Sequence, residues 1–159
     1  MSGRLLSALV LAGALSSALV AGMFYAFSSF IMAALARMPP AEGMRAMNAI
    51  NVTVITPSFM ALFMGAAVLG IALAIWSLFS ISQADSQLVL LGALLYLLGC
   101  FGVTMAFNVP LNDQLAAAPT EALWHSYLRT WTMWNSVCTA AAALSSAVLV
   151  AVALGQAAG

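Results

Sequence analysis

Five asparagines lie at or near the ends of long apolar segments, where a polar side chain is costly and therefore a candidate for function. They are Asn48, Asn51, Asn108, Asn112 and Asn135. Asn48 and Asn51 are three residues apart, so they share one face of a helix. A convergent set of amides could orient the polar groups of a bound molecule, which makes all five candidate catalytic residues. The alternative is that they cap or end helices, a role that asparagine fills well.

His125 is the only histidine in the sequence. Glu121, His125 and Arg129 follow each other at four-residue intervals, so one face of a helix could align them. A histidine can act as an acid or base near neutral pH, or serve as the axial ligand of a haem iron. We therefore keep His125 as a candidate base or haem ligand, with an ordinary surface position as the alternative. A metal site with several ligands is not expected, because His, Cys and acidic residues are too few at any usual spacing.

Aromatic side chains crowd the entry to the last apolar segment. Trp131 and Trp134 are three residues apart and share a face with Asn135. They could form the wall of a pocket for a flat ligand, with Arg129 closing it and Tyr25 from the first segment adding a phenol. The alternative is the belt of Trp and Tyr that marks membrane–water interfaces.

The composition identifies the surroundings of these residues. Of 159 residues, 65% are hydrophobic and 5% are charged, and the mean hydropathy is +1.10. A soluble domain has about 25% charged residues. We therefore predict an integral membrane protein whose partner is the lipid bilayer, located in the inner membrane if the source is bacterial. With a net charge of zero and no basic stripe, nucleic acid is not expected as a partner.

Four apolar segments are each long enough to cross a bilayer, which takes roughly 20 residues in a helix. We expect spans over about residues 5–36, 52–81, 87–107 and 130–154. The fold class is then all-α: an up-down-up-down bundle of four transmembrane helices in a single domain, 1–159. Pro110 is expected to end the third span, and a short turn over 82–86 to precede it. The first segment exceeds the apolar part of a signal peptide, so we expect it to be kept.

This topology places the first and third connections at the same membrane face, together with most of the polar residues. Arg37, Arg45 and Arg129 belong to that face, against Arg4 on the other. The positive-inside rule then predicts that the site face is cytoplasmic. Cys100 and Cys138 lie inside apolar runs and are expected to be small core residues without a disulfide.

Several short motifs, taken in order, resemble one known family. They are Phe24-Tyr25-Ala26-Phe27, then Met47-Asn48-Ala49-Ile50-Asn51 with Pro57-Ser58-Phe59 behind it, then Asn108-Val109-Pro110-Leu111-Asn112, and finally Trp131-Thr132-Met133-Trp134-Asn135. The sequence resembles the anthrone-oxygenase-like family of small four-helix membrane proteins. By that resemblance, the matching polar positions are the five asparagines, Trp131 and Trp134. The family pattern has a His and an Arg shortly after the Trp-Asn pair, where this sequence has Ser136 and Cys138.

The resemblance implies an oxidoreductase that oxidises a small, apolar, aromatic secondary metabolite with O₂ as co-substrate, as better-known members convert an anthrone to an anthraquinone. Two possibilities stay open for the cofactor: none, or a haem held by His125. His125 and Arg129 could also replace the missing family residues. The alternative function is a non-enzymatic membrane module that binds a small molecule, or a structural subunit of a homo-oligomer. An inward convergence of the asparagines on a cavity would favour the enzyme or the binder.

Overall fold

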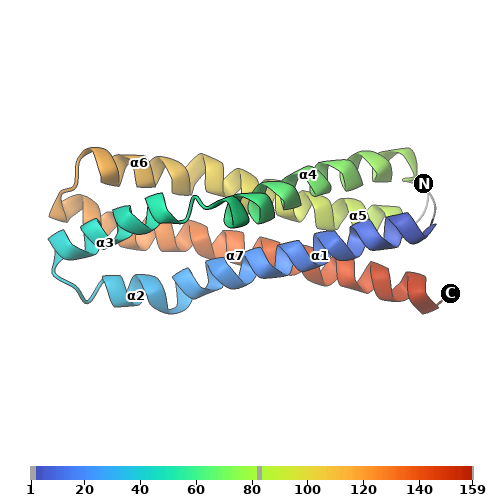
Figure 1. The fold of residues 1–159 in the computed structure, drawn as a ribbon, viewed down its shortest axis with the longest axis horizontal. Coiled ribbons are helices and arrows are strands. Elements are labelled where there is room, and N and C mark those ends of the chain that lie inside the picture. The colour runs from blue at the N-terminus through green and yellow to red at the C-terminus, as the bar shows by residue number, and fades with distance from the viewer. Residues whose placement is uncertain (1–2, 82–83, 159) are drawn as a thin grey trace.

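The computed structural model describes residues 3–81 and 84–158, and within these residues every element is a helix. The helices are stacked end to end into four long rods that run side by side (Figure 1). The first rod consists of α1 (Gly3–Ala26), the π-helix η1 (Phe27–Ile31) and α2 (Met32–Leu35), and the second consists of α3 (Pro40–Thr53) and α4 (Pro57–Phe79). The third rod consists of α5 (Ala84–Leu94), the π-helices η2 (Leu95–Gly102) and η3 (Thr104–Asn108), and α6 (Val109–Ala117). The fourth rod is the single helix α7 (Glu121–Ala158).

The rods form an antiparallel bundle in which each rod packs against two neighbours. Helix α1 packs against α7 and α4, while α5 packs against α4 and α7. The start of α1 and the end of α7 lie at one end of the bundle, and α3 and α6 lie at the other (Figure 1). Four helical segments are long and apolar enough to cross a membrane, over Arg4–Leu35, Pro57–Phe79, Asp85–Ala117 and Glu121–Gln156. The predicted four-helix transmembrane bundle is confirmed, and the protein is an integral membrane protein.

The second span begins at Pro57 and not at residue 52 as predicted, because the second rod is broken at residues 54–56. Pro57 has no N–H to continue the helix, and it restricts the residue before it to extended backbone. Thr56 is accordingly extended, with φ −92° and ψ 152°. The backbone N–H of Phe59 donates to Thr56 Oγ1 at 3.2 Å, so Thr56 caps the start of α4.

The third span does not end at residue 107, and Pro110 does not stop it. The rod passes through η3 into α6 and reaches Ala117. Pro110 falls in the first turn of α6, where a missing N–H is tolerated. The fourth span begins at Glu121, well before residue 130. Thr120 Oγ1 caps this helix by accepting the N–H of Leu123 at 3.2 Å. Of the predicted turn at 82–86, residues 82 and 83 lie outside the described residues, and Ser86 belongs to α5.

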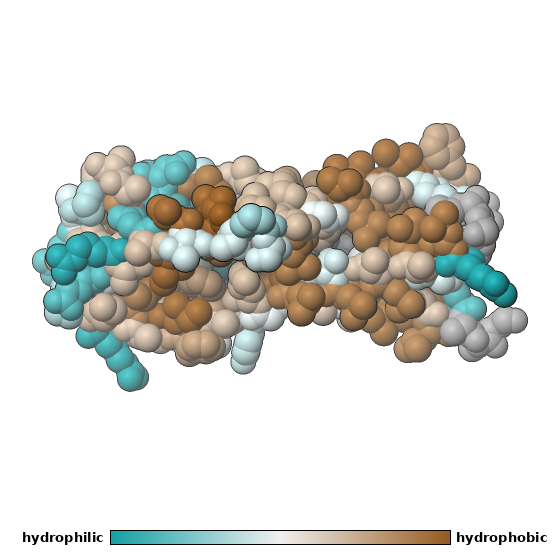
Figure 2. Space-filling view, in the orientation of Figure 1, coloured by the Kyte–Doolittle hydropathy of each residue, from teal (hydrophilic) through white to brown (hydrophobic). Residues whose placement is uncertain are grey.

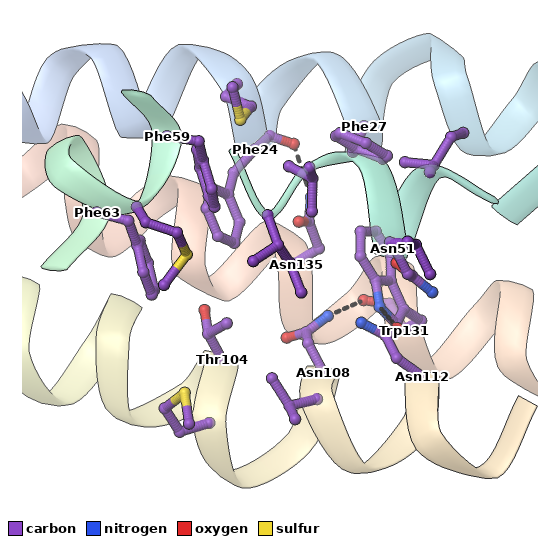
Figure 3. A pocket seen from close by; sticks show the side chains of 18 of the residues that line it. Phe24, Phe27, Asn51, Phe59, Phe63, Thr104, Asn108, Asn112, Trp131 and Asn135 are labelled. Carbon is purple, nitrogen blue, oxygen red and sulfur yellow. Dashed lines mark hydrogen bonds between the residues drawn. The ribbon is translucent and has the colours of Figure 1, made fainter. Parts of the chain in front are cut away.

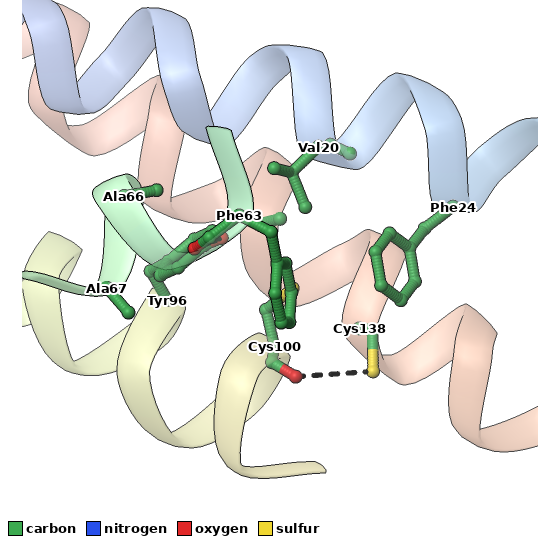
Figure 4. Close-up of a cluster of buried hydrophobic side chains, with 10 residues drawn as sticks. Val20, Phe24, Phe63, Ala66, Ala67, Tyr96, Cys100 and Cys138 are labelled. Carbon is green, nitrogen blue, oxygen red and sulfur yellow. Dashed lines mark hydrogen bonds between the residues drawn. The ribbon is translucent and has the colours of Figure 1, made fainter. Parts of the chain in front are cut away.

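The core consists of three clusters of buried side chains spaced along the bundle. The middle cluster joins Phe24, Phe63, Tyr96, Cys100 and Cys138 (Figure 4). Both cysteines are free and buried. Here the third rod and α7 approach so closely that a Cβ added to Gly99 would lie 2.5 Å from the Cβ of Ala141. The glycine at position 99 therefore allows the close approach of these two rods.

The surface divides the bundle into a polar end and an apolar remainder. Hydrophilic residues gather at the end that holds α3 and the start of α7, whereas apolar residues cover most of the other end (Figure 2). At 1.5 Å per residue, the 23 residues of α4 extend about 35 Å and the 38 residues of α7 about 57 Å. The hydrocarbon core is about 30 Å thick. Helix α4 alone is therefore long enough to span it, and α7 is longer than the core is thick.

Candidate functional site

A pocket of about 580 Å³ lies between the junction of α3 with α4 and the third rod, with α1 and α7 behind it (Figure 3). Its lining is mainly apolar, and its polar side chains are Asn48, Asn51, Thr104, Asn108, Asn112, Asp113 and Asn135. All five asparagines singled out by the sequence therefore converge on one cavity. An apolar cavity of this size with a few convergent polar groups is the usual form of a small-molecule site.

Backbone irregularities position these side chains. At the level of the pocket, the first rod contains η1, the second is broken at residues 54–56, and the third contains η3. Single π-helical segments within α-helices often occur at functional sites, because they redirect side chains. Phe27 in η1 and Asn108 at the end of η3 both line the pocket. Three of the four rods thus depart from regular α-helix where the cavity is formed.

Asn112 is held in a single orientation by two donors from α7. Its Oδ1 accepts hydrogen bonds from Tyr127 Oη at 2.7 Å and from Trp131 Nε1 at 2.8 Å. An indole N–H can only donate, so the atom that it contacts must be the carboxamide oxygen. The amide nitrogen of Asn112 makes neither of these contacts and remains available as a donor.

Asn135 is also held in a single orientation, but its nitrogen and not its oxygen makes the hydrogen bonds. Its Nδ2 donates to the backbone carbonyl of Phe24 at 2.6 Å and to Ser28 Oγ at 2.7 Å, which ties α7 to the first rod. A carbonyl oxygen can only accept, so the contacting atom must be the nitrogen. The two N–H groups of Asn135 are occupied, and its oxygen is the polar atom left for a ligand.

Asn108 crosses to α7 as well, since its Nδ2 donates to the backbone carbonyl of Trp131 at 3.2 Å. Two further amides are only partly satisfied. Asn48 Oδ1 and Asn51 Nδ2 are buried and have no hydrogen-bond partner among the described residues. Buried polar groups without a partner are rare in folded proteins. Both residues line the pocket, but the Asn51 side chain also faces the Tyr127 hydroxyl, so the missing partner that a bound molecule could supply is chiefly that of Asn48.

The apolar part of the pocket is rich in aromatic rings. Phe59 and Phe63 stack with their centroids 5.6 Å apart, and Phe63 stacks on Phe24 at 6.1 Å. Phe27 is tilted against Trp131 with centroids 5.6 Å apart. Phe24, Phe59 and Phe63 lie together on one side of the pocket, whereas Trp131 lies on the other side beside Asn51 and Asn112 (Figure 3). A flat, apolar molecule would contact rings on one side and amides on the other.

Four predicted site residues lie away from this pocket and are absent from its lining. His125 is 66% exposed, and its Nε2 lies 3.8 Å from Glu121 Oε1. Tyr25 and Arg129 are exposed, and Trp134 is half-buried, stacked on Phe107 with centroids 3.8 Å apart. The pocket lining contains no histidine, so a haem ligated by His125 would lie outside the pocket.

The residues at the departure from the family pattern have structural partners. Ser136 Oγ donates to the carbonyl of Thr132 at 2.8 Å and lies 2.9 Å from Ser28 Oγ. Cys138 is buried, with its Sγ 3.6 Å from the carbonyl of Cys100. Neither lines the pocket, and neither His125 nor Arg129 is brought there to replace the family residues.

Sequence reasoning missed several residues of the pocket. Phe63, Thr104 and Asp113 were not predicted as site residues, but all three line the cavity. The four-residue spacing of Phe59 and Phe63 was a usable signal, because it places both rings on one face of α4. No sequence pattern indicated that Thr104 would line the pocket, because its position there depends on the π-helix η3.

Residues 59–148, more than half of the chain, match the sequence model of the anthrone oxygenase family. The matched region runs from the start of α4 into α7 and includes three of the five asparagines: Asn108, Asn112 and Asn135. Asn48 and Asn51 precede it. No curated protein and no solved structure matches the chain.

Proposed function

Because this chain belongs to the anthrone oxygenase family, we propose that it is a membrane-embedded oxygenase that oxidises a small, apolar, aromatic metabolite with O₂. The observation that carries the proposal is the convergence of five asparagines on one apolar pocket. Amides spent on helix capping would not need to face a common cavity. In this proposal the substrate ring lies against the phenylalanines and Trp131, and the amides orient its polar groups.

Substrate reaches the pocket from the bilayer. Val52 and Ile55 line the pocket beside the break in the second rod, and they are 75% and 67% exposed. In this proposal the opening, which lies beside the start of α4 at Pro57, is at the edge of the hydrocarbon core. An apolar molecule dissolved in lipid would therefore meet an apolar opening at the depth of the site.

The proposed reaction converts a ring CH₂, which lies opposite an aromatic ketone in the same ring, into a second ketone. The CH₂ carbon loses a proton, and the resulting carbanion gives its electrons to O₂ and forms a C–O bond. The peroxide that results takes up the proton and then loses water: one O₂ is consumed, and one ketone and one H₂O are formed. The substrate supplies all the electrons, so no external reductant enters the balance.

Asp113 is the proposed proton acceptor. It is the one carboxylate in the pocket lining, and it lies in α6 next to Asn112. Positioned carboxylates perform general base catalysis of this kind. With Arg37, Arg45 and Arg129 at the same end of the bundle, the site face is proposed to be cytoplasmic.

The test is O₂ uptake by the purified protein with 1,8-dihydroxyanthrone, with formation of the anthraquinone followed by absorbance. Anthrones oxidise slowly on their own, so the rate is compared with that of Asp113→Asn and with detergent alone. Acceleration by the wild type and its loss in Asp113→Asn are expected. No acceleration above the detergent blank would overturn the oxygenase proposal. Saturable binding without O₂ uptake would then favour the non-enzymatic binder.

A further inference from the structure

Neighbouring residues fix the orientation of two amides in the pocket, and so determine whether each offers a ligand a donor or an acceptor. Asn112 has both lone pairs of Oδ1 occupied, by Tyr127 Oη and Trp131 Nε1. Turning the amide over would bring its N–H groups against the indole N–H, which cannot accept. Asn112 therefore cannot offer its oxygen to a ligand without losing the bond to Trp131, and its N–H groups are what it offers.

We propose that Asn112 is the oxyanion donor of this site: its amide N–H binds the ketone oxygen of the substrate and holds the negative charge that develops there. This inference rests on the proposed function, because the charge arises when the CH₂ on the opposite side of the ring loses its proton and the negative charge spreads through the aromatic system to the ketone oxygen. The electron pair of the broken C–H bond is then shared between the carbon and the ketone oxygen. A donor already aimed at that oxygen stabilises the charged state more than the neutral one.

Asn135 offers the ligand a hydrogen-bond acceptor, whereas Asn112 offers a donor. Its N–H groups bind Phe24 and Ser28, so its free oxygen can accept from a hydroxyl group or contact a polarised C–H. A substrate placed between the two amides would direct its ketone toward Asn112. The geometry thus assigns a recognition pattern, with an acceptor at one position of the ligand and a donor or acidic C–H at another.

Tyr127 acts through Asn112 as a positioning residue. It is fully buried, lies outside the pocket lining, and is stacked between Trp124 and Trp131 with centroids 5.7 and 6.1 Å away. Its hydroxyl is therefore held in place to occupy one lone pair of Asn112. It makes no contact with the substrate in this arrangement.

The decisive variant is Asn112→Asp. A carboxylate keeps an oxygen for Tyr127 and Trp131, so the bonds that hold the side chain remain, but it replaces the pocket N–H by a second oxygen. We expect a folded protein with unchanged thermal stability. Its kcat should fall about 10²–10³-fold, which is the usual effect of removing one oxyanion donor. Binding of 1,8-dihydroxyanthraquinone, a ketone that does not react, should be at least tenfold weaker. Wild-type binding and turnover in Asn112→Asp would overturn the inference.

A second variant separates positioning from general structural effects. Tyr127→Phe should lower kcat in the wild-type background but have no further effect on kcat in the Asn112→Asp background, because the two residues act as one unit. Equal losses in both backgrounds would contradict the positioning role. Binding of the anthraquinone is measured without O₂ uptake. A wild type that binds it but consumes no O₂ would refute the proposed function, while Asn112→Asp would still decide whether Asn112 is the donor.

Discussion

Replacing Asn48 by Leu should stabilise the ligand-free protein, although the change removes a candidate functional residue. Asn48 Oδ1 is buried without a hydrogen-bond partner among the described residues. Such a group loses its hydration on folding and gains nothing in return. The matched control is Asn135→Leu, the same chemical change within a helix, at a position where the amide makes two cross-helix hydrogen bonds.

The expected magnitudes follow from these contacts. An unsatisfied buried polar group costs about 1–3 kcal/mol, so removing it from Asn48 should raise the free energy of unfolding by roughly 1–2 kcal/mol after imperfect packing of Leu. Each hydrogen bond lost at Asn135 should cost about 0.6–1.7 kcal/mol in a membrane protein. At about 2–4 °C per kcal/mol for a chain of this size, the Tm should rise by a few degrees in the first variant and fall by a few degrees in the second.

The assay is thermal unfolding of detergent-purified protein followed by tryptophan fluorescence, with and without 1,8-dihydroxyanthraquinone. The wild type should gain Tm on adding the anthraquinone, and Asn48→Leu should gain less, because it lacks the oxygen reserved for the ligand. A Tm that falls in Asn48→Leu as far as in Asn135→Leu would show that Asn48 is already hydrogen-bonded, and the reasoning would be refuted.

Three further outcomes are expected. Gly99→Ala should lower the free energy of unfolding by about 1–3 kcal/mol, because its Cβ would lie 2.5 Å from that of Ala141. The control Gly65→Ala, whose Cβ meets nothing within 4 Å, should be neutral or stabilising. Equal Tm values for the two variants would contradict the close contact at Gly99. His125→Ala should leave O₂ uptake unchanged, because the side chain is exposed outside the pocket; loss of uptake would return His125 to the mechanism. Pro57→Ala should weaken anthraquinone binding by allowing the second rod to continue as a helix through the opening; unchanged affinity would show that other residues maintain the break.

The transmembrane bundle was predictable because composition and segment length alone determine it. The bounds of the spans were not, since they depend on how proline is accommodated. At Pro57 the helix is interrupted, whereas at Pro110 it continues, because η3 places Pro110 in a first helical turn. Nothing in the local sequence distinguishes these two cases.

The five asparagines could be identified because polar side chains are rare in so apolar a chain. Their roles could not, because the orientation of each amide is set by residues distant in the sequence. Asn135 is fixed by Phe24, which lies 111 positions earlier. The i, i+4 spacing that aligned His125 with Glu121 was real, but it placed both on an exposed face of α7. Helical spacing shows which residues share a face and leaves open what that face contacts.

Under the proposed function, the opening beside Val52 and Ile55 would also determine how the rate depends on the amount of membrane. An apolar metabolite partitions into lipid, so the pocket samples its mole fraction in the bilayer and not its concentration in the aqueous phase. At a fixed total amount of substrate, adding detergent or lipid lowers that mole fraction. The protein would then follow surface-dilution kinetics, in which the apparent KM expressed per litre grows with the volume of the apolar phase. In a cell, the same feature would couple turnover to the area of the membrane that holds both the protein and its substrate.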